Sequence, residues 1–114
     1  MTLTIYFAKI IVEKITKVAG MAASILERAD ALFEAILKLK TKEDCAKFFE
    51  DVCTMKEIED LTQRLEVAAM LKEGKNYREI SLATGASTAT ISRVNKCILY
   101  GKGGYDTVLK KEID

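Results

Sequence analysis

Histidine and proline are both absent from this 114-residue sequence, and each absence excludes a class of protein. Without histidine, nucleophilic catalysis with a histidine base is excluded, and a zinc site of the common type is not expected. The lack of proline in a chain rich in Ala, Leu, Ile, Lys and Glu predicts helices and argues against an all-β fold. No paired-carboxylate or phosphate-loop signature occurs, so we expect neither an enzyme nor a bound cofactor.

Cysteine is scarce: Cys45, Cys53 and Cys97 are odd in number and have no C-x-x-C spacing. This pattern argues against a secreted disulfide framework and against a metal site. We therefore predict buried, reduced thiols in a cytoplasmic protein.

Long apolar runs are also missing, although the first twenty residues are largely apolar and β-branched. Four charged residues interrupt them, so no run approaches the roughly 20 residues of a membrane helix, and a secretory signal fits poorly. These are Lys9, Glu13, Lys14 and Lys17. Helical spacing of the apolar residues predicts an amphipathic helix. It either packs on a partner subunit or is an upstream extension, with Met21 as an alternative start.

Charge is nearly balanced at +1 but unevenly distributed along the chain. Residues 41–66 hold four Lys/Arg against eight Asp/Glu, whereas residues 72–102 hold six Lys/Arg against two Glu. A basic block beside an acidic one is what a phosphate-facing surface would need. Two ordinary solvated faces are the alternative interpretation.

Helix-start and helix-stop signals recur after residue 21. An apolar stripe over residues 26–40 predicts one helix, and Thr41 is positioned to cap a second, with an apolar face from Cys45 to Val52. Thr54 and Glu57 form a capping-box pattern that opens a third helix, which Gly74 ends. A short last helix is expected over residues 105–113.

Residues 76–93 have the pattern of a helix-turn-helix, with a capping pattern at Asn76 to Glu79, a turn at Gly85 and a helix capped by Ser87 that runs to about Tyr100. Gly85 supplies the positive φ that a sharp turn needs. Five apolar residues are predicted to face inward: Ile80, Ala83, Ile91, Val94 and Ile98.

The residues expected to face DNA lie at the start of the second of these helices: Ser87, Thr88, Ala89, Thr90 and Ser92. Small side chains allow close approach to base edges, hydroxyls can hydrogen-bond bases, and methyl groups can contact thymine methyls. Arg78 is predicted to reach a guanine edge or a phosphate, and three lysines are predicted to contact the DNA backbone: Lys75, Lys96 and Lys102. A Ser/Thr-capped surface helix with solvated lysines is the structural alternative.

The runs Gln63–Glu66, Tyr77–Ile80 and Gly85–Arg93 resemble the Trp repressor family, and are closer to its YerC/YecD branch. The resemblance covers about residues 23–106. It implies an all-α protein of five to six helices that forms an intertwined homodimer and binds double-stranded DNA at a pseudo-palindromic operator. We therefore divide the chain into an N-terminal extension (1–20), a DNA-binding domain (21–106, with the helix-turn-helix at about 76–100) and a tail (107–114).

The resemblance also implies a ligand pocket, because tryptophan-responsive members hold the indole between two arginines. Arg64 and Arg93 match these arginines, and Thr54 matches a residue beside the amino and carboxylate groups. Val94, however, stands where the family has glycine, and Cys97 where it has a serine that meets the amino group. Loss of that partner costs roughly 1–3 kcal/mol. We therefore expect no tryptophan corepressor.

The predicted function is a homodimeric, sequence-specific transcriptional regulator, acting as a repressor without a membrane segment. The homodimer is also expected because apolar stripes on residues 22–40 and 45–52 have little intrachain surface to cover them. The alternatives are a protein-interaction or assembly module that uses the same helices, a tryptophan-responsive repressor, and a replication-origin reader of the DnaA C-terminal type. The last of these normally follows an ATPase module, and this chain has no phosphate-binding loop.

Overall fold

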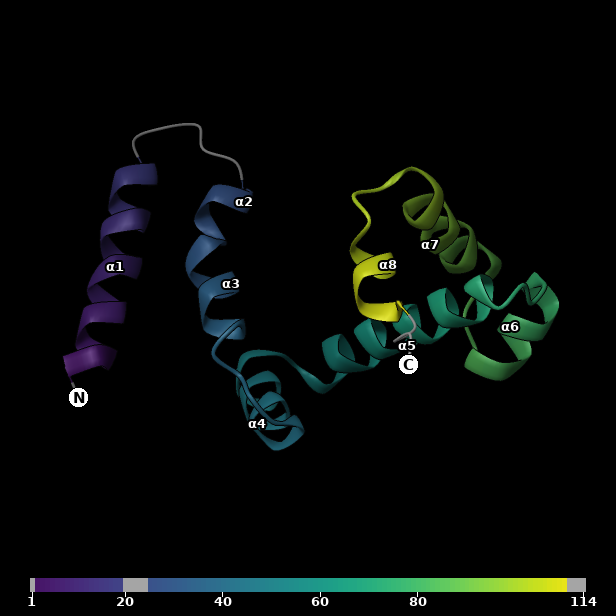
Figure 1. Cartoon of the computed structure of the whole chain (residues 1–114), viewed down its shortest axis with the longest axis horizontal. Helices are drawn as coiled ribbons and strands as arrows, with labels where there is room; N and C mark the ends of the chain where they lie inside the picture. The colour runs from purple at the N-terminus through teal and green to yellow at the C-terminus, as the bar shows by residue number, and fades with distance from the viewer. Residues whose placement is uncertain (1, 20–24, 111–114) are drawn as a thin grey trace. The chain divides into compact units, whose positions relative to one another are not determined.

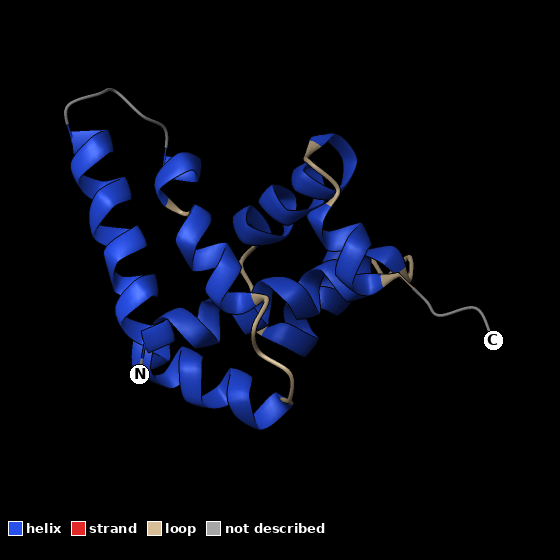
Figure 2. Cartoon of the chain, turned by 60° about the vertical axis from the view of Figure 1, so that its left-hand side comes forward, coloured by secondary structure: helices blue, strands red, loops and turns tan. Residues whose placement is uncertain are grey.

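The computed structural model describes residues 2–19 and 25–110, and in them it contains helices and loops without strands (Figures 1 and 2). The prediction of an all-α fold is confirmed. The helices of the described residues are α1 (Thr2–Ala19), α2 (Ile25–Arg28), α3 (Asp30–Ile36), α4 (Lys42–Val52), α5 (Met55–Lys72), α6 (Tyr77–Thr84), α7 (Thr88–Tyr100) and α8 (Gly104–Leu109). They outnumber the expected five to six because the N-terminal extension forms α1 and the next predicted helix is divided. The chain forms two compact units, Met1–Phe48 and Phe49–Asp114.

In the first unit, α1 lies beside α2 and α3 (Figures 1 and 2). Lys14 of α1 pairs with Asp30, and the Lys38 ammonium group lies 4.5 Å from the centroid of the Phe7 ring. Ala31 of α3 is buried at 5% exposure. The predicted N-terminal helix is thus present, and it is held to α3 and the residues after it by polar contacts.

The helix predicted to continue to residue 40 ends earlier, at Ile36. The backbone N–H groups of Lys38 and Leu39 each donate 3.1 Å hydrogen bonds to carbonyls three residues earlier, which tightens and ends the helix. The break between α2 and α3 is slight, because the Ala29 N–H still donates to the Ile25 carbonyl at 2.9 Å. Residues 22–24 of the apolar stripe described for residues 22–40 lie outside the described residues.

Side-chain caps begin the next two helices as predicted. The Thr41 hydroxyl accepts the Asp44 backbone N–H at 3.0 Å at the start of α4. At the start of α5 the Thr54 hydroxyl accepts the Glu57 N–H at 3.1 Å, and the Glu57 carboxylate accepts the Thr54 N–H at 2.8 Å. The backbone and side-chain hydrogen bonds with Thr54 lower the pKa of the Glu57 carboxyl, because both favour its charged form.

The core of the second unit lies between α5, α6 and α7. Its buried side chains are Val67, Ala68, Ile80, Ala86, Ile91 and Val94. The inward prediction is confirmed for Ile80, Ile91 and Val94, and Ile98 is half-buried against them. It is wrong for Ala83, which is exposed. The apolar stripe of α6 continues from Ile80 to the half-buried Thr84, one turn on, and Ala83 lies to the side of that line.

The last helix is shorter than predicted, because α8 ends at Leu109; residues 111–113 of the predicted helix lie outside the described residues. Tyr105 and Leu109 pack against the core, and Lys72 of α5 pairs with Asp106. These contacts join α8 to the C-terminal half of α5.

The prediction of buried thiols is wrong. Cys45 and Cys97 are exposed and Cys53 is half-buried, and all three are free. Cys97 lies beside the line from Val94 to Ile98 that packs on the core, so the helix turns its side chain to solvent. Among the described helices, none is long and apolar enough to cross a membrane.

Candidate nucleic-acid interface

The first helix of the predicted reading motif, α6, begins with a complete capping box. The Asn76 side chain accepts the Glu79 N–H at 2.9 Å, and the Glu79 carboxylate accepts the Asn76 N–H at 3.0 Å. Two backbone donors at the helix start are thereby satisfied by residues three positions apart. Arg78, the second residue of α6, lies in its first turn and is exposed.

The turn between α6 and α7 depends on Gly85, which adopts φ +75° in the left-handed region. Its N–H donates to the Ser81 carbonyl at 2.8 Å and closes the end of α6. No heavy atom lies within 4 Å of the position that a Cβ would occupy. Glycine is therefore required here by the backbone conformation and not by crowding, which confirms the sequence argument.

Three polar side chains that the sequence analysis did not select close the same turn. The Thr84 hydroxyl donates to the Ile80 carbonyl at 2.8 Å and accepts the Ala86 N–H at 3.1 Å. The Ser81 hydroxyl donates to the Ala86 carbonyl at 2.9 Å. Gln63 of α5 donates from Nε2 to the Thr84 carbonyl at 3.1 Å.

Ser87 caps α7, and its hydroxyl accepts the Thr90 N–H at 3.2 Å. The same hydroxyl donates to the Thr90 hydroxyl at 3.1 Å. Ser87, Thr88 and Ala89 are exposed, whereas Thr90 and Ser92 are half-buried. We call the five residues predicted to face DNA, 87–90 and 92, the reading surface. Its most accessible part is the first turn of α7, and the hydrogen bonds with Ser87 restrain the orientation of the Thr90 side chain.

Exposed cations lie on the same two helices and just before α6. Lys75, Arg78, Arg93 and Lys96 are exposed, and none of them belongs to an ion pair within the described part of the chain. Lys72 differs, because it pairs with Asp106. The cations of the basic block that have no ion pair in the described residues thus lie on α6, on α7, at Lys75 and at Lys102.

The three residues predicted for a ligand pocket are all exposed: Thr54, Arg64 and Arg93. The Thr54 hydroxyl is engaged in the capping box of α5. Val94, beside Arg93, is only 1% exposed and its side chain lies in the core. Thr54, the N-cap of α5, and Arg64 lie about three turns apart along that helix.

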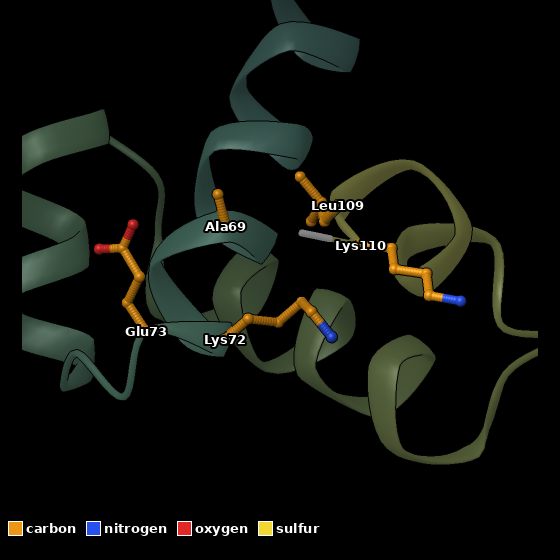
Figure 3. A pocket seen from close by; sticks show the side chains of 5 residues that line it. All are labelled: Ala69, Lys72, Glu73, Leu109 and Lys110. Carbon is orange, nitrogen blue, oxygen red and sulfur yellow. The ribbon is translucent and has the colours of Figure 1, made fainter. Parts of the chain in front are cut away.

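A pocket does occur elsewhere, between the C-terminal part of α5 and the end of α8 (Figure 3). It has a volume of about 330 Å³ and is lined by Ala69, Lys72, Glu73, Leu109 and Lys110. None of the predicted ligand residues or DNA-contacting residues lines it. We assign it no part in the reading surface.

Comparison with known proteins agrees with this geometry. The sequence model described as "Trp repressor protein" matches residues 27–113. The chain is 55% identical over 82 residues to the "Uncharacterized protein YerC" of Bacillus subtilis (strain 168), covering 72% of this chain and 79% of YerC.

Two solved structures are similar, each with a TM-score of 0.68. The crystal structure of a "putative Trp repressor" from Staphylococcus aureus is 50% identical, covering 70% of this chain and 80% of that one. The structure of a "TrpR like protein" from Eubacterium eligens ATCC 27750 is 57% identical, covering 69% and 81%. The chain therefore belongs to the Trp repressor family, in the branch that includes YerC.

Proposed function

We propose that the protein is a sequence-specific double-stranded DNA-binding regulator, acting as a repressor. The observation that carries this proposal is the accessible first turn of α7, which follows a left-handed glycine turn and is accompanied by exposed cations on α6 and α7. A helix start with small side chains fits the major groove, where donors and acceptors distinguish the base pairs. Membership of the Trp repressor family supports the same function.

Within this surface the residues have different roles. Ser87, Thr88, Ala89 and Thr90, with Ser92 behind them, are proposed to read base edges. Arg78 contacts a base edge or a phosphate, and Lys75 and Lys96 contact phosphates. Phosphate contacts supply affinity without sequence preference, so variants of the two groups should behave differently.

The regulator is proposed to act as a homodimer on a pseudo-palindromic operator. Its support is a set of exposed apolar side chains: Phe33 of α3 is 46% exposed, Leu37 directly after α3 is 83% exposed, and Leu61 in the N-terminal half of α5 is 46% exposed. Exposed large apolar side chains such as these are typical of interfaces. Sedimentation at micromolar concentration should give a dimer, and a stable monomer would refute this part of the proposal.

Tryptophan is proposed not to act as corepressor. The support is that Val94 fills core space beside Arg93 and that the Thr54 hydroxyl already has a backbone partner. A polar ligand would have to replace that hydrogen bond, which costs roughly 1–3 kcal/mol. Arg64 and Arg93 are then free to contact phosphates.

A selection from randomised duplexes at physiological salt, with and without tryptophan, tests these points together. We expect one enriched sequence with two related half-sites, bound equally in both conditions. Arg78→Ala and Thr90→Ala should weaken binding to it, whereas Lys47→Ala, the same loss of charge within the acidic stretch, should not. Equal affinity for all duplexes would refute sequence-specific binding, and enrichment only with tryptophan would favour a tryptophan-responsive repressor.

A protein-interaction module is the second candidate, and exposed apolar side chains on the same helices favour it. Leu82 is 79%, Leu99 61% and Tyr100 84% exposed. If these residues face a protein, the native protein should copurify with one fixed partner and without nucleic acid. Copurification with DNA would exclude that use of the surface.

A further inference from the structure

The backbone carbonyl of Thr84 needs a hydrogen-bond donor from outside its own helix. It lies in the reading head, which we define as residues 76–100. Thr84 is the last residue of α6, and the final carbonyls of a helix have no partner within it. The chain then turns away through Gly85, so α6 cannot supply a donor. The observed donor is Nε2 of Gln63, at 3.1 Å in a half-buried setting.

Gln63 belongs to α5 and is 21 residues away in sequence. The other side-chain hydrogen bonds of this turn, from Ser81 and Thr84, stay within the reading head. Gln63 therefore ties the turn to a different helix. It lies one turn before Val67, which is fully buried, so the amide extends the core-facing side of α5 toward the turn.

Packing and this hydrogen bond contribute differently to the position of the head. The contacts of Val67, Ile80, Ile91 and Val94 are apolar and non-directional, so they stabilise α6 and α7 on α5 without determining their exact orientation. A hydrogen bond restrains both distance and angle. The restrained carbonyl lies three residues before Ser87, where the reading surface begins.

We propose that Gln63 is a positioning residue that holds the reading head in its DNA-binding orientation without a bound effector. The inference rests on the proposed DNA-binding function. It adds that a residue of the chain itself sets the orientation of the reading head, so that DNA binding needs no effector. A recognition surface must keep its geometry to within about 0.5 Å and 10–20° to discriminate well. Loss of this restraint should therefore reduce discrimination between duplexes more than it reduces overall affinity.

The test uses the full chain, the duplex enriched in the selection and a scrambled duplex. Gln63→Met keeps the length of the side chain but removes its donor, and Gln63→Glu keeps the shape without an N–H. Thr62→Val is the matched control, because Thr62 is exposed on the same helix and its hydroxyl donates to the Ile58 carbonyl one turn back, at 2.8 Å.

Both Gln63 variants should bind the enriched duplex roughly tenfold more weakly and the scrambled duplex within twofold of wild type. Amide exchange at Gly85 and Ala86 should be about tenfold faster in the Gln63 variants and unchanged in Thr62→Val. Proportional loss on both duplexes, or unchanged exchange at the turn, overturns the inference. If the wild-type protein prefers no duplex, the proposed function is refuted instead. Amide exchange at Gly85 and Ala86 then still tests whether Gln63 restrains the turn.

Discussion

Replacing Gly85 with alanine measures how much the reading turn depends on its backbone conformation. An added methyl group would meet nothing within 4 Å, so crowding contributes no cost. The φ of +75° remains, and a left-handed conformation costs an L-residue roughly 1–2 kcal/mol. We therefore expect Gly85→Ala to lower the free energy of unfolding by about 1–2 kcal/mol, with a melting temperature several degrees lower.

Two other glycines separate conformation from crowding. Gly104 begins α8 without a positive φ, and its added methyl group also meets nothing within 4 Å, so Gly104→Ala should be neutral or stabilise by up to about 1 kcal/mol. Gly101 has an ordinary φ of −84°, but a methyl group there would lie 2.3 Å from the Cys97 carbonyl oxygen. Gly101→Ala should therefore destabilise by crowding alone.

Urea unfolding followed by far-UV circular dichroism gives the three values. All variants must be compared at one protein concentration, because dimer formation would make apparent stability depend on it. If Gly85→Ala lost no more than Gly104→Ala, the assigned role of the left-handed turn would be refuted.

Three further predictions concern stability and binding. Hydrogen bonds with Thr54 lower the pKa of Glu57, so the charged Glu57 carboxylate contributes fully to the free energy of unfolding at neutral pH. This contribution is lost as pH falls from about 4.5 through the lowered pKa. Glu57→Gln should therefore flatten that part of an acid-unfolding curve. Ile91→Ala, at a fully buried site, should cost roughly 2–4 kcal/mol in urea unfolding, whereas Leu82→Ala, at 79% exposure, should stay within about 0.5 kcal/mol. Lys75→Gln should weaken enriched and scrambled duplexes equally and reduce the salt slope of log K by about 0.9; a change confined to the enriched duplex would contradict its phosphate role.

Local signals in the sequence predicted the helix starts well. The caps at Thr41, Thr54, Asn76 and Ser87 are all present, because each depends on a partner only three residues away. The left-handed Gly85 was predictable for the same reason, since a turn after a capped helix needs its backbone freedom. The same local signals gave the order of the helices, and the resemblance gave the Trp repressor family, which the comparisons confirm.

Properties that depend on packing were less predictable. Helical periodicity predicted an inward Ala83, but the buried face of α6 passes through Thr84 and leaves Ala83 exposed. The sequence also gave no reason to expect that Cys45 and Cys97 are exposed. The hydrogen bond from Gln63 to Thr84 joins residues 21 positions apart, so no local pattern could reveal it. Ser81 and Thr84 carried a weaker signal, because hydroxyl residues near a helix end often bond to nearby carbonyls.

The short range of the caps has a consequence for the order of folding. The hydrogen bonds that start α6 and α7 each close a loop of only a few residues, which forms quickly and at little entropic cost. The bond from Gln63 closes a much longer loop. We expect α6 and α7 to form transiently early in folding and to dock on α5 later. In a mutational analysis of the folding transition state, φ-values (ratios of kinetic to equilibrium free-energy changes) near zero for Gln63 and higher for the caps would indicate this order.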